Sequence, residues 1–99
     1  MTINKMLNGD TVTLALEGRI DTATTPALQA AVLEAFQGAK NLVLDFEKVP
    51  YISSAGLRAL LIGQKTATSK RGKMELININ EMVYSILETV GFTDILNLR

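Results

Sequence analysis

The apolar run NLVLDF, residues 41–46, lies between two segments whose apolar residues recur at helical spacing. The length and composition of this run are typical of a buried central strand. The flanking patterns predict helices over about residues 25–38 and 55–70. Strand–helix–strand units cross over with right-handed chirality, which makes the strands that they join parallel. The chain is therefore expected to be an α/β protein with a parallel core.

A hairpin is expected before this core. Val12, Leu14 and Leu16 alternate with polar residues, which is typical of a half-buried strand. The preceding NGD, residues 8–10, favours a tight hairpin turn, so residues 2–7 are expected to form an antiparallel partner strand. After the hairpin, Thr25 and Pro26 are expected to be the N-cap and the first residue of the first helix.

The C-terminal part predicts one more strand and one more helix. The run KMELININ predicts a strand that ends near Ile79, and Asn80 is expected to cap a third helix over about residues 81–90. One face of this helix is expected to carry the apolar residues Val83, Ile86, Leu87 and Val90. The tail FTDILNL fits a short strand or a helical turn, and both remain open. The fold prediction is one domain over residues 1–99, with a mixed four- to five-stranded sheet whose first strand is antiparallel and whose next three are parallel.

Composition removes several classes of function. The chain has no histidine and no cysteine, so the usual zinc sites and Ser-His-Asp or Cys-His catalysis are unavailable. The formal net charge is zero and the longest basic cluster is KRGK, which argues against nucleic-acid binding. The longest apolar stretch, ALLIG, is too short to cross a bilayer, and no signal-peptide pattern opens the chain. We expect a cytoplasmic protein with no catalytic residue, no metal and no cofactor.

Three loops are expected to meet at one edge of the sheet, because the carboxyl ends of parallel strands lie together and ligands or partners bind there. They span Gly18 to Thr25, Glu47 to Ser54 and Asn78 to Glu81. This topology predicts one rim that carries Asp21, Ser53, Ser54 and Asn80. Asp21 is expected to bond the backbone of the following turn or to make a polar contact at the rim, whereas Asp45 is expected to be structural.

The segment YISSAGLRAL, residues 51–60, is the main candidate for a site. Ser54 is expected at the N-cap of the second helix, with its Oγ near the amides of Gly56 or Leu57. Gly56 is costly inside a helix, so another backbone, a phosphate or a partner chain is expected close to it. Ile52 breaks the G-x-S-x-G pattern of a nucleophile elbow, and the segment lacks the glycines and lysine of a phosphate-binding loop. Ser54 is then either a helix cap or a serine that receives a phosphoryl group.

Several motifs together resemble the STAS domain along essentially the whole chain. They are EGRID before a capped helix, LVLDFEKVPYISSAGLRALL, a glycine turn into a strand, and NINEMVYSILETVGFTDIL. More specifically, the chain resembles bacterial anti-sigma-factor antagonists, whose usual core motif reads D-S-S/T-G-L. Alignment on Gly56 puts Ser54 at the phosphorylated serine, Ser53 at the aspartate and Ala55 at the following Ser/Thr. Ser53 is the second candidate for phosphorylation.

This resemblance implies partner switching rather than catalysis. The unphosphorylated protein would bind an anti-sigma factor that is also a serine kinase, which frees the sigma factor. The kinase would use its own ATP to phosphorylate Ser54, and a PP2C-type phosphatase would restore the active form. The resemblance and the predicted rim imply the partner-binding residues Asp21, Thr22, Ser53, Ser54, Ala55, Gly56, Leu57, Arg58 and Asn80.

Three other functions remain open. A STAS-like accessory subunit of a lipid-transport ATPase would use the same rim as a constitutive binding module, without a phosphate cycle. A small-molecule or nucleotide sensor and a hydrolase are disfavoured, since the chain lacks histidine and a glycine-rich loop. The oligomeric state is left open.

Overall fold

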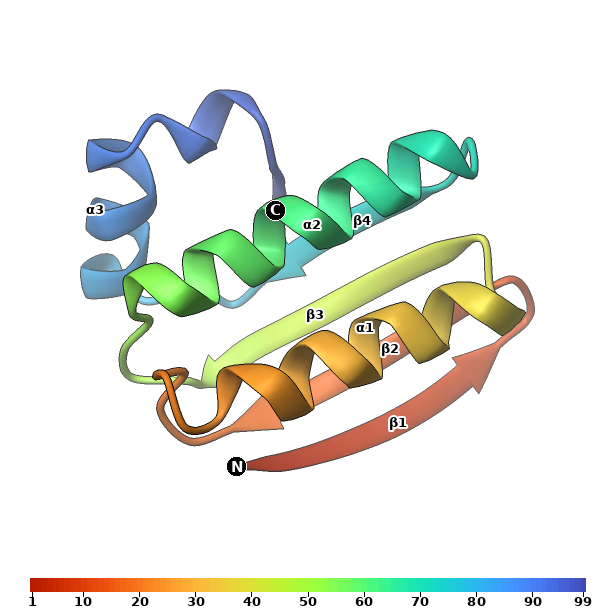
Figure 1. Ribbon diagram of the computed structural model, residues 1–99, viewed down its shortest axis with the longest axis horizontal. Coiled ribbons are helices and arrows are strands. Elements are labelled where there is room, and N and C mark those ends of the chain that lie inside the picture. Colours follow the sequence, from red (N-terminus) through yellow and green to blue (C-terminus); the bar gives the residue numbers. More distant parts are fainter.

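A five-stranded sheet in the order β1-β2-β3-β4-β5 forms the frame of the computed structural model, which describes residues 1–99 (Figure 1). β1 is antiparallel to β2, and the other neighbouring strands are parallel. The elements in chain order are β1 (Thr2–Asn8), β2 (Thr11–Glu17), α1 (Thr25–Gly38), β3 (Asn41–Lys48), α2 (Ser54–Ser69), β4 (Lys73–Ile77), α3 (Glu81–Thr89), the 3-10 helix η1 (Phe92–Asp94) and β5 (Asn97–Leu98). The predicted α/β class, hairpin and parallel core are confirmed.

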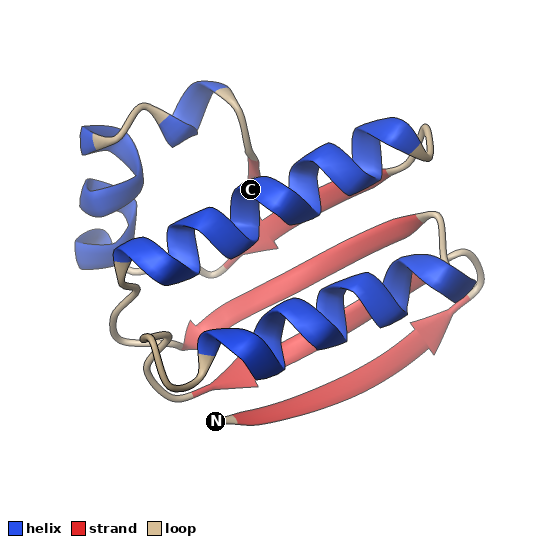
Figure 2. Ribbon diagram, viewed as in Figure 1, coloured by secondary structure: helices blue, strands red, loops and turns tan.

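The core lies between one face of the sheet and the two long helices. Figure 2 shows α1 and α2 across the same face of the sheet, with α3 standing at one end of it. On β2, Val12, Leu14 and Leu16 are buried, whereas the residues that alternate with them are half-buried or exposed, as the alternation predicts. β3 occupies the centre of the sheet and buries most of its apolar residues, so the prediction of a buried central strand is confirmed.

The capping residue of α1 and the last residue of α3 each differ by one position from those predicted. The N-cap of α1 is Thr24 rather than Thr25, which is the first helical residue and is buried. The Thr25 hydroxyl donates a hydrogen bond to the Asp21 carbonyl oxygen at 2.6 Å, so this side chain ties the helix to the preceding loop. In α3, Val83 and Leu87 are buried as predicted, but Val90 follows the last helical turn and is largely exposed.

The tail contains both of the structures that its sequence allows. Gly91 adopts the left-handed conformation with φ of 79°, and η1 follows it directly. β5 then pairs in parallel with β4. Leu96, which lies between η1 and β5 in the chain, is buried in the core. None of the helices has the length and apolar character needed to cross a membrane.

Candidate functional site

Two of the three predicted loops are joined by backbone hydrogen bonds. Ile20, after β2, forms an isolated parallel bridge with Ile52, after β3. The Ile20 amide donates to the Tyr51 carbonyl at 3.0 Å, and the Ser53 amide donates to the Ile20 carbonyl at 2.8 Å. Both isoleucines are fully buried, so this junction is anchored in the core. It fixes the loop that carries Asp21 beside the start of α2.

The third loop is attached through Asn80. The Asn80 Oδ1 atom accepts a hydrogen bond from the Val83 amide at 2.8 Å, which makes Asn80 the N-cap of α3 as predicted. Its Nδ2 atom donates to the Val49 carbonyl oxygen at 3.0 Å, in the loop that leads to α2. The side chain of Asn80 therefore joins α3 to the loop between β3 and α2, residues 49–53, which we call the serine loop. Both polar atoms of this side chain are engaged in this role.

The two serines have different positions in α2, and the N-cap prediction for Ser54 is wrong. The N-cap is Ser53, which has extended backbone angles (φ −90°, ψ 173°) and whose Oγ accepts a hydrogen bond from the Gly56 amide at 3.3 Å. The extended angles follow from the Ile20–Ile52 bridge, because it holds the chain in strand-like conformation up to Ser53. Ser54 is the first helical residue, is exposed, and its hydroxyl forms no hydrogen bond within the chain.

Core packing, rather than a ligand or a partner, explains the glycine in the first turn of α2. A Cβ atom at Gly56 would lie 2.5 Å from Ile20 Cγ2 and 2.7 Å from Ile52 Cγ1. Gly56 therefore lets the start of α2 approach the buried bridge that joins the loops. Leu57 is also buried, at 7% exposure, while Ala55 is half-buried and Arg58 is exposed. Of this turn, Ser54, Ala55 and Arg58 present side chains to solvent.

Asp21 is a turn residue, as one of its two predicted roles requires. Its Oδ1 atom accepts hydrogen bonds from the Ala23 and Thr24 amides, both at 3.0 Å, and from the Thr24 hydroxyl at 3.2 Å. These hydrogen bonds lower the pKa of Asp21, and the largest contribution comes from the Thr24 amide. Desolvation of the carboxylate opposes this shift, whereas the Thr24 hydroxyl, the Ala23 amide and the nearby charge of Arg19 add to it. The adjacent Thr22 is exposed. The carboxylate thus holds the shape of the loop beside α2.

A contact between Arg19 and Tyr51 at the rim was not predicted from the sequence. The Arg19 guanidinium lies 4.6 Å from the centre of the Tyr51 ring, which is a cation–π contact between the first and second loops. No spacing rule pairs residues that lie so far apart in the sequence. Their pairing follows from the Ile20–Ile52 bridge, which places the two neighbouring residues opposite each other.

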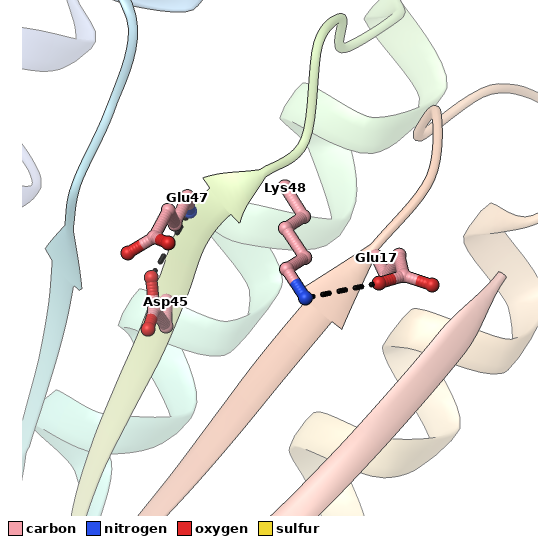
Figure 3. A network of polar contacts seen from close by, with 4 residues as sticks. All are labelled: Glu17, Asp45, Glu47 and Lys48. Carbon is pink, nitrogen blue, oxygen red and sulfur yellow. Dashed lines mark hydrogen bonds and ion pairs between the residues drawn. The ribbon is translucent and has the colours of Figure 1, made fainter.

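A second polar group lies at the same ends of β2 and β3, and Figure 3 shows it with the helices behind the strands. Lys48 Nζ lies 3.5 Å from Glu17 Oε2. The Asp45 carboxylate accepts hydrogen bonds from the Glu47 amide and from Asn78 Nδ2, both at 3.0 Å. Asp45 thus joins β3 to the end of β4, in keeping with its predicted structural role. No group of three or more acidic side chains is arranged to hold a metal ion.

Comparisons with known proteins place this geometry in a family. A family model of the STAS domain matches residues 2–99. BtrV of Bordetella bronchiseptica, described as a candidate anti-sigma-factor antagonist, is 32% identical over 81 residues, which cover 81% of this chain and 70% of BtrV.

Solved structures share the fold at lower identity. A candidate anti-sigma-factor antagonist from Thermotoga maritima superposes with a TM-score of 0.90 at 19% identity, covering 97% of this chain and 84% of that chain. The anti-sigma-factor antagonist SpoIIAA in its unphosphorylated form gives 0.78 at 21% identity, covering 99% of this chain and 87% of that chain. The phosphorylated form of SpoIIAA, a Bacillus protein, gives 0.77 at 19% identity, covering 99% and 91%.

Proposed function

The chain belongs to the STAS domain family, and from this membership we propose that it is a cytoplasmic anti-sigma-factor antagonist that acts by partner switching. As a single STAS domain without enzymatic activity, it binds a serine-kinase anti-sigma factor when unphosphorylated and thereby frees the sigma factor. The kinase then phosphorylates Ser54 and the complex separates. A PP2C-type phosphatase removes the phosphate and restores binding.

The observation that carries this proposal is the state of the Ser54 hydroxyl. Ser54 is exposed at the first position of α2, and its hydroxyl has no hydrogen-bond partner within the chain. The Ser53 Oγ atom, by contrast, already accepts a hydrogen bond from the Gly56 amide. An attacking hydroxyl must be accessible and free to rotate toward the incoming phosphorus atom. Ser54 meets both conditions, so it is favoured over Ser53 as the acceptor.

The transfer needs nothing from this chain except the hydroxyl. Ser54 Oγ forms a bond to the γ-phosphorus of the kinase-bound ATP, the bond from that phosphorus to the β–γ bridging oxygen breaks, and ADP leaves. The hydroxyl proton goes to a base on the kinase. In the reverse branch, water attacks the phosphoserine phosphorus on the phosphatase, inorganic phosphate leaves, and the serine hydroxyl is regenerated.

Ser53 stands where the resemblance places an aspartate, and its position accounts for this exchange. Serine and aspartate are comparably good N-cap residues, because each offers an oxygen to the amide two or three residues on. Ser53 therefore keeps the cap of α2 while it removes a negative charge next to Ser54. A phosphate on Ser54 then forms without repulsion from an adjacent carboxylate.

The charge of a phosphate on Ser54 is sufficient to end binding to the partner kinase. It adds about −1.5 to −2 charge at pH 7. The free chain accommodates this charge at the amino end of α2, where the helix dipole favours anions. In a complex the same group occupies space and meets the charges of the partner, and a differential cost of about 3 kcal/mol weakens binding more than a hundredfold.

The phosphorylation site is tested by intact mass measurement after incubation with the cognate kinase and Mg-ATP. We expect a gain of one phosphate in the native chain and in Ser53→Ala, and none in Ser54→Ala. Phosphate gain by Ser54→Ala but not by Ser53→Ala would move the site to Ser53. No gain in any of the three, with a kinase that phosphorylates a control substrate, would refute the phosphate cycle.

The switch itself is tested by titrating the kinase with three chains. We expect Ser54→Asp to bind at least tenfold more weakly than the native chain, and Ser54→Ala to bind with unchanged affinity. Equal binding by all three chains would contradict partner switching. That result would instead indicate a constitutive binding module, such as an accessory subunit of a lipid-transport ATPase.

A further inference from the structure

Arg58 lies on the same exposed line of α2 as Ser54. The helix runs without interruption through both residues, and Ser54, Arg58 and Lys65 are all exposed while Gly56, Leu57, Ala59 and Leu60 are buried. Residues four apart are neighbours on a helix surface. Long helical side chains also lean toward the amino end and cover the turn before their own Cα atom. Arg58 therefore reaches over the turn that begins with Ser54.

The guanidinium of Arg58 is not engaged elsewhere in the chain. The two ion pairs join Lys48 to Glu17 and Arg99 to Glu75, and the one cation–π contact belongs to Arg19. α2 contains no acidic residue, and Arg58 is the only charged residue between Ser54 and Gln64. An exposed arginine that has no carboxylate on its own helix is available to an anion one turn away.

We propose that, once Ser54 is phosphorylated, Arg58 pairs with the phosphate through its guanidinium and holds it along α2. This proposal rests on Ser54 as the acceptor in the proposed function. Planar guanidinium groups donate two parallel N–H hydrogen bonds to phosphate oxygens, and a dianionic phosphoserine supplies three oxygens to receive them. The pairing is intramolecular and needs no movement of the backbone.

Other charged groups near the rim are already engaged or lie on other elements. On the first loop, the Asp21 carboxylate accepts hydrogen bonds from its own turn, and Arg19 is stacked over Tyr51. Glu81 begins α3 on the third loop. Arg58 is the one cation that shares a helix turn with Ser54. Its pairing changes the partner-binding surface twice, because an anion is added and an available cation is withdrawn.

The test uses chains in which phosphoserine is incorporated at residue 54 during synthesis, so that no kinase is involved. The second pKa of the phosphate is measured by 31P NMR titration. We expect this pKa to be lower in the native background than in Arg58→Gln by about 0.3 units or more, since an opposite charge one helical turn away stabilises the dianion. Lys65→Gln removes the same charge about 16 Å from Ser54 along the helix and is expected to leave the pKa nearly unchanged.

A second control places phosphoserine at residue 53, which is five residues from Arg58 and outside the helix. There, Arg58→Gln is expected to shift the phosphate pKa much less than it does with phosphoserine at residue 54. Equal phosphate pKa values in the native and Arg58→Gln chains phosphorylated at residue 54 would overturn the proposal. A phosphate pKa shift in Lys65→Gln as large as that in Arg58→Gln would overturn it too. If the pKa difference is found but no kinase modifies Ser54, the proposed function fails while the pairing of Arg58 stands.

Discussion

Gly56 shows how one residue can belong to the site and the core together. It lies in the first turn of α2 beside Ser53 and Ser54, yet its constraint comes from Ile20 and Ile52 on the buried side. Any Cβ atom at this position would clash with the Ile20–Ile52 bridge, which holds the first loop against α2. Glycine here therefore maintains the position of the site without contacting a ligand.

Gly56→Ala is expected to destabilise the chain by about 1–2 kcal/mol, although alanine is the better helix former by about 0.5–1 kcal/mol. The new methyl group would lie within 2.5–2.7 Å of Ile20 and Ile52, both of which are tightly enclosed. Urea unfolding followed by circular dichroism measures this change. Gly38→Ala is the matched control, because no atom lies within 4 Å of its Cβ position. Equal stability of the two variants would contradict the packing argument.

Asp21 makes a stability prediction that depends on pH. Hydrogen bonds from its turn hold its folded pKa below the unfolded value, so its contribution to stability is complete above about pH 4 and is lost as pH falls through the lower, folded pKa. Asp21→Asn keeps an acceptor oxygen but cannot ionise. The native chain is therefore expected to exceed the variant in urea midpoint at pH 6, with the difference shrinking toward pH 2. A difference that is constant with pH would contradict this role for the carboxylate.

Which of the two adjacent serines caps α2 could not be predicted from the sequence. Two adjacent serines before a helical pattern are both acceptable caps, and the pattern alone fixes the helix start only to within a residue or two. The Ile20–Ile52 bridge decides between them, because it keeps Ser53 extended and starts α2 at Ser54. Such a contact joins residues far apart in the sequence and leaves no local signal.

Among the elements, α3 depends most clearly on a single side chain for its attachment. Asn80 caps this short helix and donates to the Val49 carbonyl, so the helix and the serine loop are held by one amide group. The cap was predictable from asparagine before a helical pattern. The second bond was not, since it depends on how the loop after β3 turns at Val49 and Pro50.

Asn80→Ala is expected to cost about 1–2 kcal/mol, because it removes both the cap and the bond to Val49. Asn80→Asp keeps the acceptor for the Val83 amide but loses the donor, so it separates the two contributions. Hydrogen exchange at the Val83 amide is expected to accelerate in Asn80→Ala and to remain close to native in Asn80→Asp. Acceleration in both variants would show that the bond to Val49 controls the start of α3.

Helix and strand identities were predictable up to the end of α3, because each of these elements carries its own hydrophobic period. Buried positions of α1 recur at Leu28, Val32, Ala35 and Phe36, and those of β2 alternate, so each element carries its own period. The exposed Val90 breaks the pattern because α3 ends at Thr89, before the next turn is complete. The two-residue strand β5 has too few residues to carry any period.

In the whole molecule, the order of elements was sufficient to predict the directions of the first four strands and the edge of the sheet at which the three loops meet. Right-handed crossovers bring the ends of β2, β3 and β4 to one edge, and the three loops that leave them are joined there by hydrogen bonds. Which side chains of the rim face solvent depends on the packing of α2 against the core. Leu57 is thus buried although its neighbour Arg58 is exposed, and Asn80 is engaged in holding the loops together.

This architecture predicts that phosphorylation at Ser54 acts as a local change of charge on an unchanged fold. Ser54 lies outside the core and none of the hydrogen bonds that join the loops uses its hydroxyl, so the phosphate disturbs no internal contact. In 1H–15N correlation spectra of chains with serine or phosphoserine incorporated at residue 54, we expect shifts confined to the three loops and the first two turns of α2. Amides of β1 and of the carboxyl-terminal half of α1 are expected to stay within the line width, and shifts spread across the sheet would instead indicate a global conformational change.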